Sequence, residues 1–268
     1  MTTITSLQNP RVKDAVRLRN RRHREKVGRI VIDGARELIR AISAGVRLVD
    51  VFVCRSLCKG DDANRVLGML PTSGAEVLEV AEAVLEKVAF GGRAEGMVGI
   101  AEMPAARIEG IKLPLNPLVA VLEGVEKPGN IGAVLRSADA AGLSALIVAD
   151  ARTDLYNPNA IRASLGTIFT VPVAAATTSE TSAWLRCRGL NILAARVDGS
   201  IPYTAADFRG PTAIVLGSEA AGLTEAWRGA NVSAVRLPMR GTADSLNVSA
   251  TAAVLFYEAL RQRTTPDP

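Results

Sequence analysis

The 268-residue sequence has few of the residues that bind metals or form disulfides. It contains three cysteines, Cys54, Cys58 and Cys187, without a C-x-x-C pair, and a single histidine, His23. An odd number of scattered cysteines argues against a disulfide framework, and without a C-x-x-C unit or a second histidine no structural zinc site is suggested. One histidine inside a basic segment also leaves no Ser-His-Asp set. A structural zinc site and most histidine-dependent chemistries are therefore not expected.

Long apolar runs are absent as well. No stretch of 18 or more uncharged apolar residues occurs, and the N-terminus MTTITSLQNPRVKD has no apolar core of a signal peptide. We therefore expect no membrane association and a cytoplasmic location. Apolar residues make up 48% of the chain, which is enough to form hydrophobic cores. A length of 268 residues allows one large domain or two ordinary ones.

Positive charge is concentrated at the N-terminus. Residues 1–30 contain nine Lys and Arg against two acids, a net charge of +7, whereas the whole chain carries only +5. A segment of this density is typical of either a solvated helix face or an arm that binds a polyanion, since each neutralised phosphate releases counterions. Both interpretations stay open on charge alone.

The order of apolar patterns predicts two α/β parts. After the basic, helical segment, strands are expected at 29–34, 47–53, 75–80 and 96–103, with helices at 35–45 and 81–90. Residues 104–117 have three prolines and no clear period, which indicates a linker. From residue 118 the alternation restarts, with strands expected at 118–124, 145–150, 168–176, 191–197, 213–219 and 233–239. Strands alternating with helices favour a parallel sheet covered on both faces.

Three loops of the second part have unusual compositions and lie where ligands bind in such sheets, at the carboxyl ends of strands. In EKPGNIGAVLR, Asn130 is a candidate helix N-cap, and Arg136 lies nearly two turns further on. In VLGSEAAGL, Glu219 follows a glycine turn and is either a ligand or a capping carboxylate. In RGTADSLNVS, Ser245 is the expected N-cap, and Asn247 is a poor helix former whose amide is expected to have a role. Without G-K-[ST] or G-x-G-x-x-G, neither a P-loop nor a dinucleotide site is indicated.

Taken together and in order, these loops are similar to a known set of motifs. PGNIGAVLRSADAAG, VLGSEAAGL and LPMRGTADSLNVSATAAVLFYEALRQR resemble the three consecutive motifs of the SpoU family of RNA ribose 2′-O-methyltransferases, which is TrmH-like and belongs to the SPOUT superfamily. The resemblance covers roughly residues 118–262. The N-terminal half, opening ITSLQNPRVKDAVRLRNRRHREKVGRIVIDGARELI, is similar to an L30e-like RNA-binding domain. Its opening most resembles the 23S rRNA methyltransferases of the avilamycin-resistance type.

The resemblance implies a fold and partners. It implies an α/β protein with an L30e-like RNA-binding domain at 1–103, a linker at 104–117 and a SpoU methyltransferase domain at 118–268. That second domain would have a parallel sheet and a deep trefoil knot at its C-terminal end. It further implies S-adenosylmethionine as cofactor, no metal, a homodimer with active sites shared between chains, and ribosomal RNA, 23S above all, as substrate.

Roles carry over by matching motif positions. The motif polar residues implied to be catalytic are Asn130, Arg136, Glu219, Ser245 and Asn247. The positions implied to surround the cofactor are Gly217, Leu237, Met239, Leu246 and Ala194. The basic N-terminal part then becomes the RNA-docking surface, with Arg19, Arg21, Arg22, Arg36 and Arg40 as its candidates. Arg136 would stabilise the charge that develops on the 2′-oxygen.

Several alternatives stay open at this point. The substrate could be transfer RNA, or the protein could bind RNA without catalysis. A Rossmann-type methyltransferase would place its glycine-rich loop after the first strand, whereas here the strongest motifs come late. The sequence names neither the nucleotide nor whether the enzyme is a housekeeping protein or confers resistance to an antibiotic that targets the ribosome.

Overall fold

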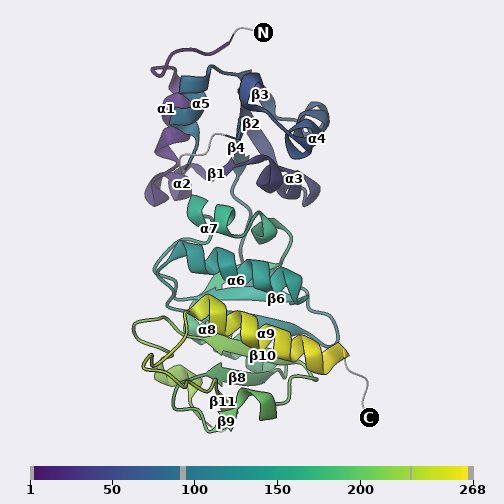
Figure 1. Cartoon of the computed structure of the whole chain (residues 1–268), viewed down its shortest axis with the longest axis vertical. Coiled ribbons are helices and arrows are strands. Elements are labelled where there is room, and N and C mark those ends of the chain that lie inside the picture. The colour runs from purple at the N-terminus through teal and green to yellow at the C-terminus, as the bar shows by residue number, and fades with distance from the viewer. Residues whose placement is uncertain (1–2, 91–94, 230, 265–268) are drawn as a thin grey trace. The chain divides into compact units, whose positions relative to one another are not determined.

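The computed structural model describes residues 3–90, 95–229 and 231–264. Its chain divides into two compact units, one formed by Met1–Ala105 with Tyr156–Thr170 and the other by Ala106–Leu155 with Val171–Pro268 (Figure 1). The segment Tyr156–Thr170 clusters with the first unit, whereas the expected division into 1–103, 104–117 and 118–268 counts it with the second. The chain therefore passes between the units at three places. The assignment of functional domains stays a prediction.

The first unit is built on a four-stranded sheet with the order β1-β4-β2-β3. Its strands are β1 (Arg29–Asp33), β2 (Leu48–Val53), β3 (Glu76–Glu79) and β4 (Met97–Glu102). β4 pairs antiparallel with both β1 and β2, and β2 pairs parallel with β3. All four strands were predicted from the apolar alternation, and the structure confirms them.

Short helices surround this sheet. They are α1 (Pro10–Arg17), α2 (Arg21–Val27), α3 (Ala35–Ser43), α4 (Asp61–Met69) and α5 (Glu82–Val88), joined by α7 (Pro158–Ala163) from the later segment. The basic N-terminal segment is helical as predicted, but it forms two helices. Asn9 and Asn20 each cap one of them by accepting from a backbone N–H, of Arg11 at 2.9 Å and of His23 at 3.3 Å.

The segment Tyr156–Thr170 is attached to the first unit through a buried carboxylate. The side chain of Asp33, at the end of β1, is 6% exposed and its Oδ2 accepts from the backbone N–H of Phe90 at 2.6 Å. Arg162 Nη1, from α7, lies 3.8 Å from the same oxygen and donates to the carbonyl of Phe90. Burial raises the pKa of Asp33 to about 6, against the lowering effects of the Phe90 N–H and of Arg162.

The second unit contains a seven-stranded sheet with the order β7-β6-β5-β10-β8-β11-β9, and every pairing in it is parallel. The strands are β5 (Leu118–Glu123), β6 (Ala145–Ala149), β7 (Val173–Ala176), β8 (Asn191–Ala195), β9 (Ile201–Pro202), β10 (Thr212–Leu216) and β11 (Val232–Arg236). β5, β6 and β10 are buried along their whole length, so both faces of the sheet are covered. The predicted parallel sheet is confirmed.

Three helices cover this sheet: α6 (Pro128–Ala140), α8 (Thr178–Cys187) and α9 (Val248–Thr264). α8 packs Trp184 and Leu185 into a cluster with Val119 and Val121, the alternate residues on one face of β5. α6 and α9 lie side by side and both contact strands of the sheet (Figure 1). The N-terminal end of α6 and the N-terminal end of α9 are where two of the three unusual loops enter their helices.

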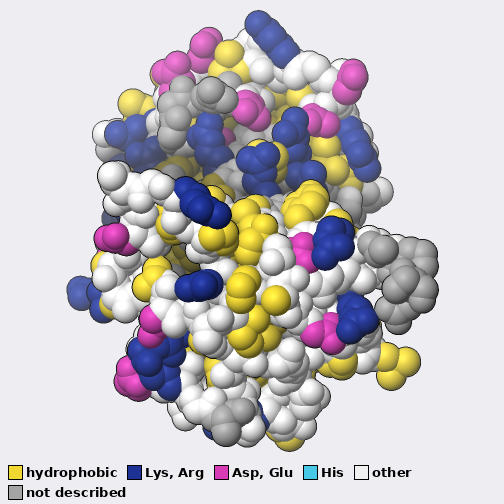
Figure 2. Space-filling view, turned by 60° about the horizontal axis from the view of Figure 1, so that its bottom comes forward, with side chains coloured by type: hydrophobic (Ala, Val, Ile, Leu, Met, Phe, Trp, Pro, Cys, Tyr) yellow, Lys and Arg dark blue, Asp and Glu magenta, His cyan; other side chains and the backbone are white. Residues whose placement is uncertain are grey.

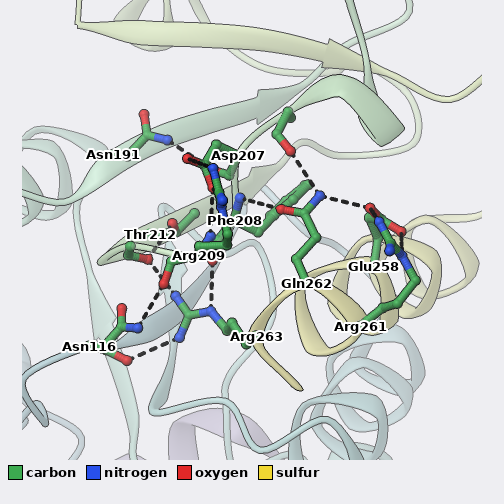
Figure 3. A network of polar contacts seen from close by, with 12 residues as sticks. Asn116, Asn191, Asp207, Phe208, Arg209, Thr212, Glu258, Arg261, Gln262 and Arg263 are labelled. Atoms are coloured by element: carbon green, nitrogen blue, oxygen red, sulfur yellow. Dashed lines mark hydrogen bonds and ion pairs between the residues drawn. The ribbon is translucent and has the colours of Figure 1, made fainter. Parts of the chain in front are cut away.

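The far end of α9 is held by a network of hydrogen bonds (Figure 3). The guanidinium of Arg263 donates to the carbonyls of Phe208, Gly210, Asn116 and Pro117 at 2.7, 2.6, 3.0 and 3.1 Å. These carbonyls belong to the segments that enter β5 and β10. A five-donor planar cation suits this task, because it satisfies several chain-end carbonyls at once. The C-terminal helix is thus fixed relative to the two central strands.

In the second half one prediction was wrong and one helix was missed. The strand predicted at 168–176 forms only at Val173–Ala176, and Thr167–Phe169 is a 3-10 turn that belongs to the first unit. The β-branched and aromatic residues at 167–169 suit a strand by propensity, but Gly166 at φ 84° and the packing of this turn override it. The helix α7 was not predicted, since six residues are too few for a periodic pattern to stand out.

Candidate functional site

The three unusual loops follow β5, β10 and β11. Because β5, β10, β8 and β11 are successive parallel neighbours, their carboxyl ends lie along one edge of the sheet. The loops after β5 and β11 each lead into a helix, α6 and α9, and the loop after β10 curls back on itself. This edge therefore gathers polar residues from segments more than a hundred positions apart.

The carboxylate of Glu219 joins the three loops. Its Oε1 accepts from Nδ2 of Asn130, in the first loop, and from Nδ2 of Asn247, in the third, the latter at 2.9 Å. The two amides also lie close to each other, with Asn247 Nδ2 3.5 Å from Asn130 Oδ1. Lys127 Nζ is 3.7 Å from Glu219 Oε2. Two amides and an ammonium group thus converge on a single side chain that is 29% exposed.

Asn247 has a second task, at the start of α9. Its Oδ1 accepts from the backbone N–H of Ser249 at 2.9 Å and its carbonyl accepts from Thr251 N, the arrangement of a helix N-cap. The prediction that Ser245 caps this helix was wrong, because the helix begins at Val248 and not at Ser245. The amide is thereby oriented: its oxygen faces the helix and its nitrogen faces Glu219.

We expect the two tasks of Asn247 to separate by substitution. Asn247→Ser retains a capping oxygen and loses only the amide donor to Glu219, whereas Asn247→Ala loses both. Asn247→Ala should therefore be less stable than Asn247→Ser by about 1 kcal/mol, the usual cost of a lost N-cap. Chemical denaturation of both variants measures this difference. Equal stabilities would show that α9 does not depend on this cap.

Asn130 also differs from its predicted local role. α6 begins at Pro128, which occupies the first helical turn, and Asn130 lies inside that turn. Proline at the first helical position needs no N–H partner and has the required φ, so this helix starts without an Asn cap. The prediction of Asn130 as N-cap was wrong, and its amide donates to Glu219 instead.

Arg136 lies apart from this cluster. It is exposed on α6, and among the residues that the structure describes no hydrogen bond or ion pair engages its guanidinium. Six residues of α-helix place it about 9 Å along the axis from Asn130 and about 120° around it. The two residues do not share a helix face, so the structure brings Asn130, Glu219 and Asn247 together without Arg136. Its charge is available to a ligand from outside this chain's own loops.

A cavity of about 500 Å³ adjoins the cluster. Its wall includes most of the positions predicted to surround a cofactor, Gly217, Leu237, Met239 and Leu246, together with Ser245 and Glu219. Ala194 lies in β8, fully buried, and its neighbour Ala195 lines the cavity in its place. Both apolar and polar groups line this wall, and a cavity of this size suits a small organic molecule.

Gly217 has a steric reason to be glycine. A Cβ at this position would lie 2.2 Å from the backbone carbon of Gly222 and 2.6 Å from Leu223 N. The loop is closed here by the bond from Gly222 N–H to the Ser218 carbonyl at 2.9 Å. Any side chain would force the loop open. Gly217 is therefore required by the approach of this loop to itself.

Charged side chains line the opposite part of the cavity. Arg196 binds Asp198 through two contacts, Nε to Oδ1 at 2.8 Å and Nη2 to Oδ2 at 2.5 Å, and Arg228 Nη2 lies 3.6 Å from Oδ2. The hydrogen bonds from Arg196 lower the pKa of Asp198. This part of the cavity therefore presents a carboxylate that stays ionised, beside two guanidinium groups.

The five arginines predicted to bind RNA all lie in the first unit, but they have different surroundings. Arg22 is exposed, while Arg21 pairs with Glu25 at 2.8 Å and Arg36 lies 3.7 Å from Asp62. Arg19 Nη2 donates to the carbonyls of Lys87 and Ala89, at 3.0 and 2.7 Å, at the end of α5. The guanidinium of Arg40 donates to the Leu165 carbonyl. Arg19 and Arg40 thus have partners within the first unit. Figure 2 shows that Lys and Arg side chains gather across the upper part of the face drawn there.

Several buried charged residues were missed by the sequence reasoning, Arg24 and Glu123 among them. Arg24, 1% exposed, donates to the carbonyls of Leu18 and Arg19 at 2.6 and 2.9 Å and so closes the end of α1. Nothing in the spacing of the basic segment distinguishes it from its neighbours. Glu123, 2% exposed, ends the apolar strand β5. An acid inside an apolar run was a usable signal, because buried carboxylates need specific partners.

Two further classes of site were sought in the described parts of the chain. In residues 3–90, 95–229 and 231–264, no group of three or more His, Cys, Asp or Glu side chains could hold a metal ion. Over the same residues, none of the helices has both the length and the apolar character needed to cross a membrane.

Two family models match the chain. Residues 117–257 match the SpoU rRNA Methylase family, and residues 9–99 match the MRM3-like substrate binding domain. The first match covers the whole edge of the sheet described above, including all three loops. The second covers β1, β2, β3 and the start of β4, together with helices α1 to α5.

Individual proteins resemble the chain over nearly its full length. The 23S rRNA (uridine(2479)-2′-O)-methyltransferase of Streptomyces viridochromogenes is 33% identical over 258 residues, which are 92% of this chain and 87% of that protein. A crystal structure of an RNA 2′-O ribose methyltransferase has a TM-score of 0.87 at 42% identity, covering 98% of this chain and 100% of that one. The SpoU methyltransferase AviRb from Streptomyces viridochromogenes, in complex with the cofactor AdoMet, has a TM-score of 0.87 at 30% identity, over 97% and 100%.

Proposed function

The chain belongs to the SpoU rRNA methylase family, and from this premise we propose that it transfers a methyl group from S-adenosylmethionine to a ribose 2′-hydroxyl of ribosomal RNA. The observation that carries the proposal is the convergence of Asn130, Glu219 and Asn247, one from each motif, beside a cavity. A protein that only docks RNA has no need for such a site. The resemblance inferred from the sequence is confirmed by the family match.

The cavity fits S-adenosylmethionine by its chemistry. Leu237, Met239 and Leu246 offer an apolar surface for an adenine ring. Asp198 and Glu219 supply negative charge that suits a sulfonium and an ammonium group, and the Arg196 side chain suits a carboxylate. When bound, this cofactor supplies an electrophilic methyl group. The AviRb structure, which contains AdoMet, supports the assignment.

We assign to Arg136 the stabilisation of negative charge on the ribose 2′-oxygen. A ribose hydroxyl is a weak nucleophile at neutral pH, so its developing negative charge needs a fixed positive partner. A guanidinium stays charged and has donors free to bind the 2′-oxygen or the adjacent phosphate. Asn130, Glu219 and Asn247 hold the three loops in place, and Ser245 lies at the cavity wall within reach of bound ligand. These roles are proposals from motif positions.

Ribosomal RNA is the substrate class we propose. The relative that acts on 23S rRNA matches both halves of the chain, not the methylase part alone, and residues 9–99 match a substrate binding domain. We further propose, from the family resemblance, a homodimer and a trefoil knot in the second unit. The insertion of β10 between β5 and β8 supports the knot, and the exposure of Tyr257 (52%) and Leu246 (42%) supports a self-association surface. Sedimentation of the purified protein tests the dimer.

The function is tested by mapping 2′-O-methylation on ribosomal RNA with and without the enzyme. Purified protein is incubated with labelled S-adenosylmethionine and either 23S rRNA or bulk transfer RNA, and modified nucleotides are located by primer extension. We expect incorporation at a single 23S nucleotide. Incorporation into transfer RNA alone would support the alternative substrate. If the protein binds S-adenosylmethionine in calorimetry but incorporates label into neither RNA, the proposed substrate is wrong. Drug susceptibility of cells with and without the gene tests the resistance role.

RNA docking should depend on exposed arginines of the first unit. We expect Arg22→Glu with Arg36→Glu to weaken RNA binding and to lower the slope of log affinity against log salt by about 2, because two phosphate contacts are lost. Filter binding at several salt concentrations measures this slope. Arg186→Glu with Lys112→Glu, an equal charge change at two exposed positions of the second unit, is the matched control and should change the slope less. Identical slopes for the two variants would move the docking surface elsewhere.

A further inference from the structure

Glu123 is a buried carboxylate with an unusually complete set of hydrogen-bond donors. It is the last residue of β5 and is 2% exposed. Its Oε1 accepts from the hydroxyls of Thr178 and Thr224, each at 2.8 Å, and its Oε2 accepts from the backbone N–H of Thr224, also at 2.8 Å. None of these three donors is a cation. Among the described residues, directed hydrogen bonds from neutral donors therefore hold this carboxylate in the interior.

The partner Thr224 ends the loop that carries Glu219. That loop leaves β10 at Leu216, which pairs with Leu122 of β5. It curls through Gly217 and Gly222 and returns to Thr224, whose N–H and hydroxyl both donate to Glu123, the residue after Leu122. Both ends of the loop are thus fastened to the same point of β5. The loop between them forms part of the cavity wall and presents Glu219 to Asn130 and Asn247.

We propose that Glu123 is a positioning residue for methyl transfer, acting through Thr224 on the loop that carries Glu219. The proposal rests on the function proposed above. Without this fastening, the loop would keep its entry at Leu216 but lose its return, and Glu219 would no longer be held against the two amides. The carboxylate touches neither the cavity nor the reacting atoms; it sets the conformation of the segment that does.

The number of donors explains why an acid is needed here. A carboxylate accepts all three bonds, and a backbone N–H such as that of Thr224 can only donate. A glutamine at this place still accepts that N–H through its oxygen, while its amide donates to hydroxyls that turn to accept. A leucine accepts nothing and leaves three donors without a partner. The severity of substitution should therefore rise from Glu123→Gln to Glu123→Leu.

A matched pair of threonines separates positioning from mere stability. Thr178 makes the same hydroxyl contact to the same oxygen at the same distance, but from α8 and not from the loop. Thr178→Val and Thr224→Val each remove one such bond with little change in shape. Only Thr224→Val loosens the loop.

The test measures thermal stability, cofactor affinity by calorimetry and the rate of RNA methylation for the full-length variants. We expect Thr224→Val to weaken S-adenosylmethionine binding about 10-fold, and Thr224→Ser, which keeps the hydroxyl, to retain the native affinity. Thr178→Val should change the affinity less than about twofold, at a loss of melting temperature similar to that of Thr224→Val. Glu123→Gln should retain most of the affinity, and Glu123→Leu should lose at least as much as Thr224→Val.

Equal effects of the two valine variants on cofactor affinity would overturn the proposal, since Glu123 would then act only through the core. So would a Thr224→Val variant with native affinity and native methylation. Amide exchange of residues 218–223 distinguishes this failure from a failure of the proposed function. If wild-type protein binds no S-adenosylmethionine, faster exchange in Thr224→Val than in Thr178→Val still supports the fastening, and equal exchange rejects it.

Discussion

Arg136→Ala should lower the rate of methyl transfer by about 10²–10³-fold, the usual effect of removing one group that stabilises a developing oxyanion. Cofactor affinity should stay within about twofold, because Arg136 is not among the residues that line the cavity. Its side chain is exposed on α6 and has no hydrogen-bond or ion-pair partner among the described residues, so the substitution should also leave the stability of the fold unchanged. Single-turnover methylation, calorimetry and thermal unfolding measure the three quantities.

Two controls make this result specific. Arg186→Ala removes an equally exposed arginine from α8 and should leave the rate unchanged. Arg136→Lys retains the charge but not the planar set of donors, and should recover only part of the rate. If Arg136→Ala transferred methyl groups at the native rate, its assigned role would be wrong. If it lost cofactor binding in proportion to its rate, the residue would act on the cofactor and not on the ribose.

The second large effect concerns stability. Arg162→Ala should destabilise the first unit by about 2–4 kcal/mol at pH 7.5, because it leaves the buried Asp33 carboxylate without its cation and the Phe90 carbonyl without a donor. Burial places the pKa of Asp33 at about 6, above the value of an unfolded aspartate. The stability that this group contributes is therefore present below about pH 4 and is lost as the pH rises through 6.

The sign of this shift predicts how the effect depends on pH. A protonated Asp33 does not need a cation, so the cost of Arg162→Ala should shrink as the pH is lowered from 7.5 to 5. Asp33→Asn should flatten the change of melting temperature between these values, and the double variant should be more stable than Arg162→Ala alone at pH 7.5. Calorimetry of the full chain measures all four proteins. A cost of Arg162→Ala that does not change with pH would show that it comes from the Phe90 contact alone.

The sequence predicted which segments form the sheets better than it predicted where individual helices and strands begin. The apolar alternation identified all four strands of the first unit, because each one stands between clear turn residues. It failed at 168–176, where Gly166 and tertiary packing turned a β-prone segment into a 3-10 turn. It also misplaced two helix starts. α6 begins at Pro128 and Asn130 donates to Glu219 instead of capping it, while α9 begins at Val248 and is capped by Asn247 and not by Ser245.

The candidate site was predictable as a set of motifs and not as a geometry. Spacing could not show that Asn130, Glu219 and Asn247 meet on a single oxygen atom, because the contacts join segments 28 to 117 residues apart. Nor could it show that Arg136 lies outside that cluster. Among the basic residues, charge density indicated the segment but did not separate exposed Arg22 from Arg24, which is buried and closes a helix.

The three passages of the chain between the two units bear on how such enzymes acquire new targets. A unit joined by one linker can be exchanged as a cassette during evolution or in the laboratory. Here the first unit includes Tyr156–Thr170, and its Arg162 contacts Asp33 across more than a hundred positions of sequence. A graft that replaced residues 1–105 alone would bring a foreign surface to that segment. On the proposal that the first unit docks the RNA, changing which RNA is recognised requires two separate stretches of the gene to change together.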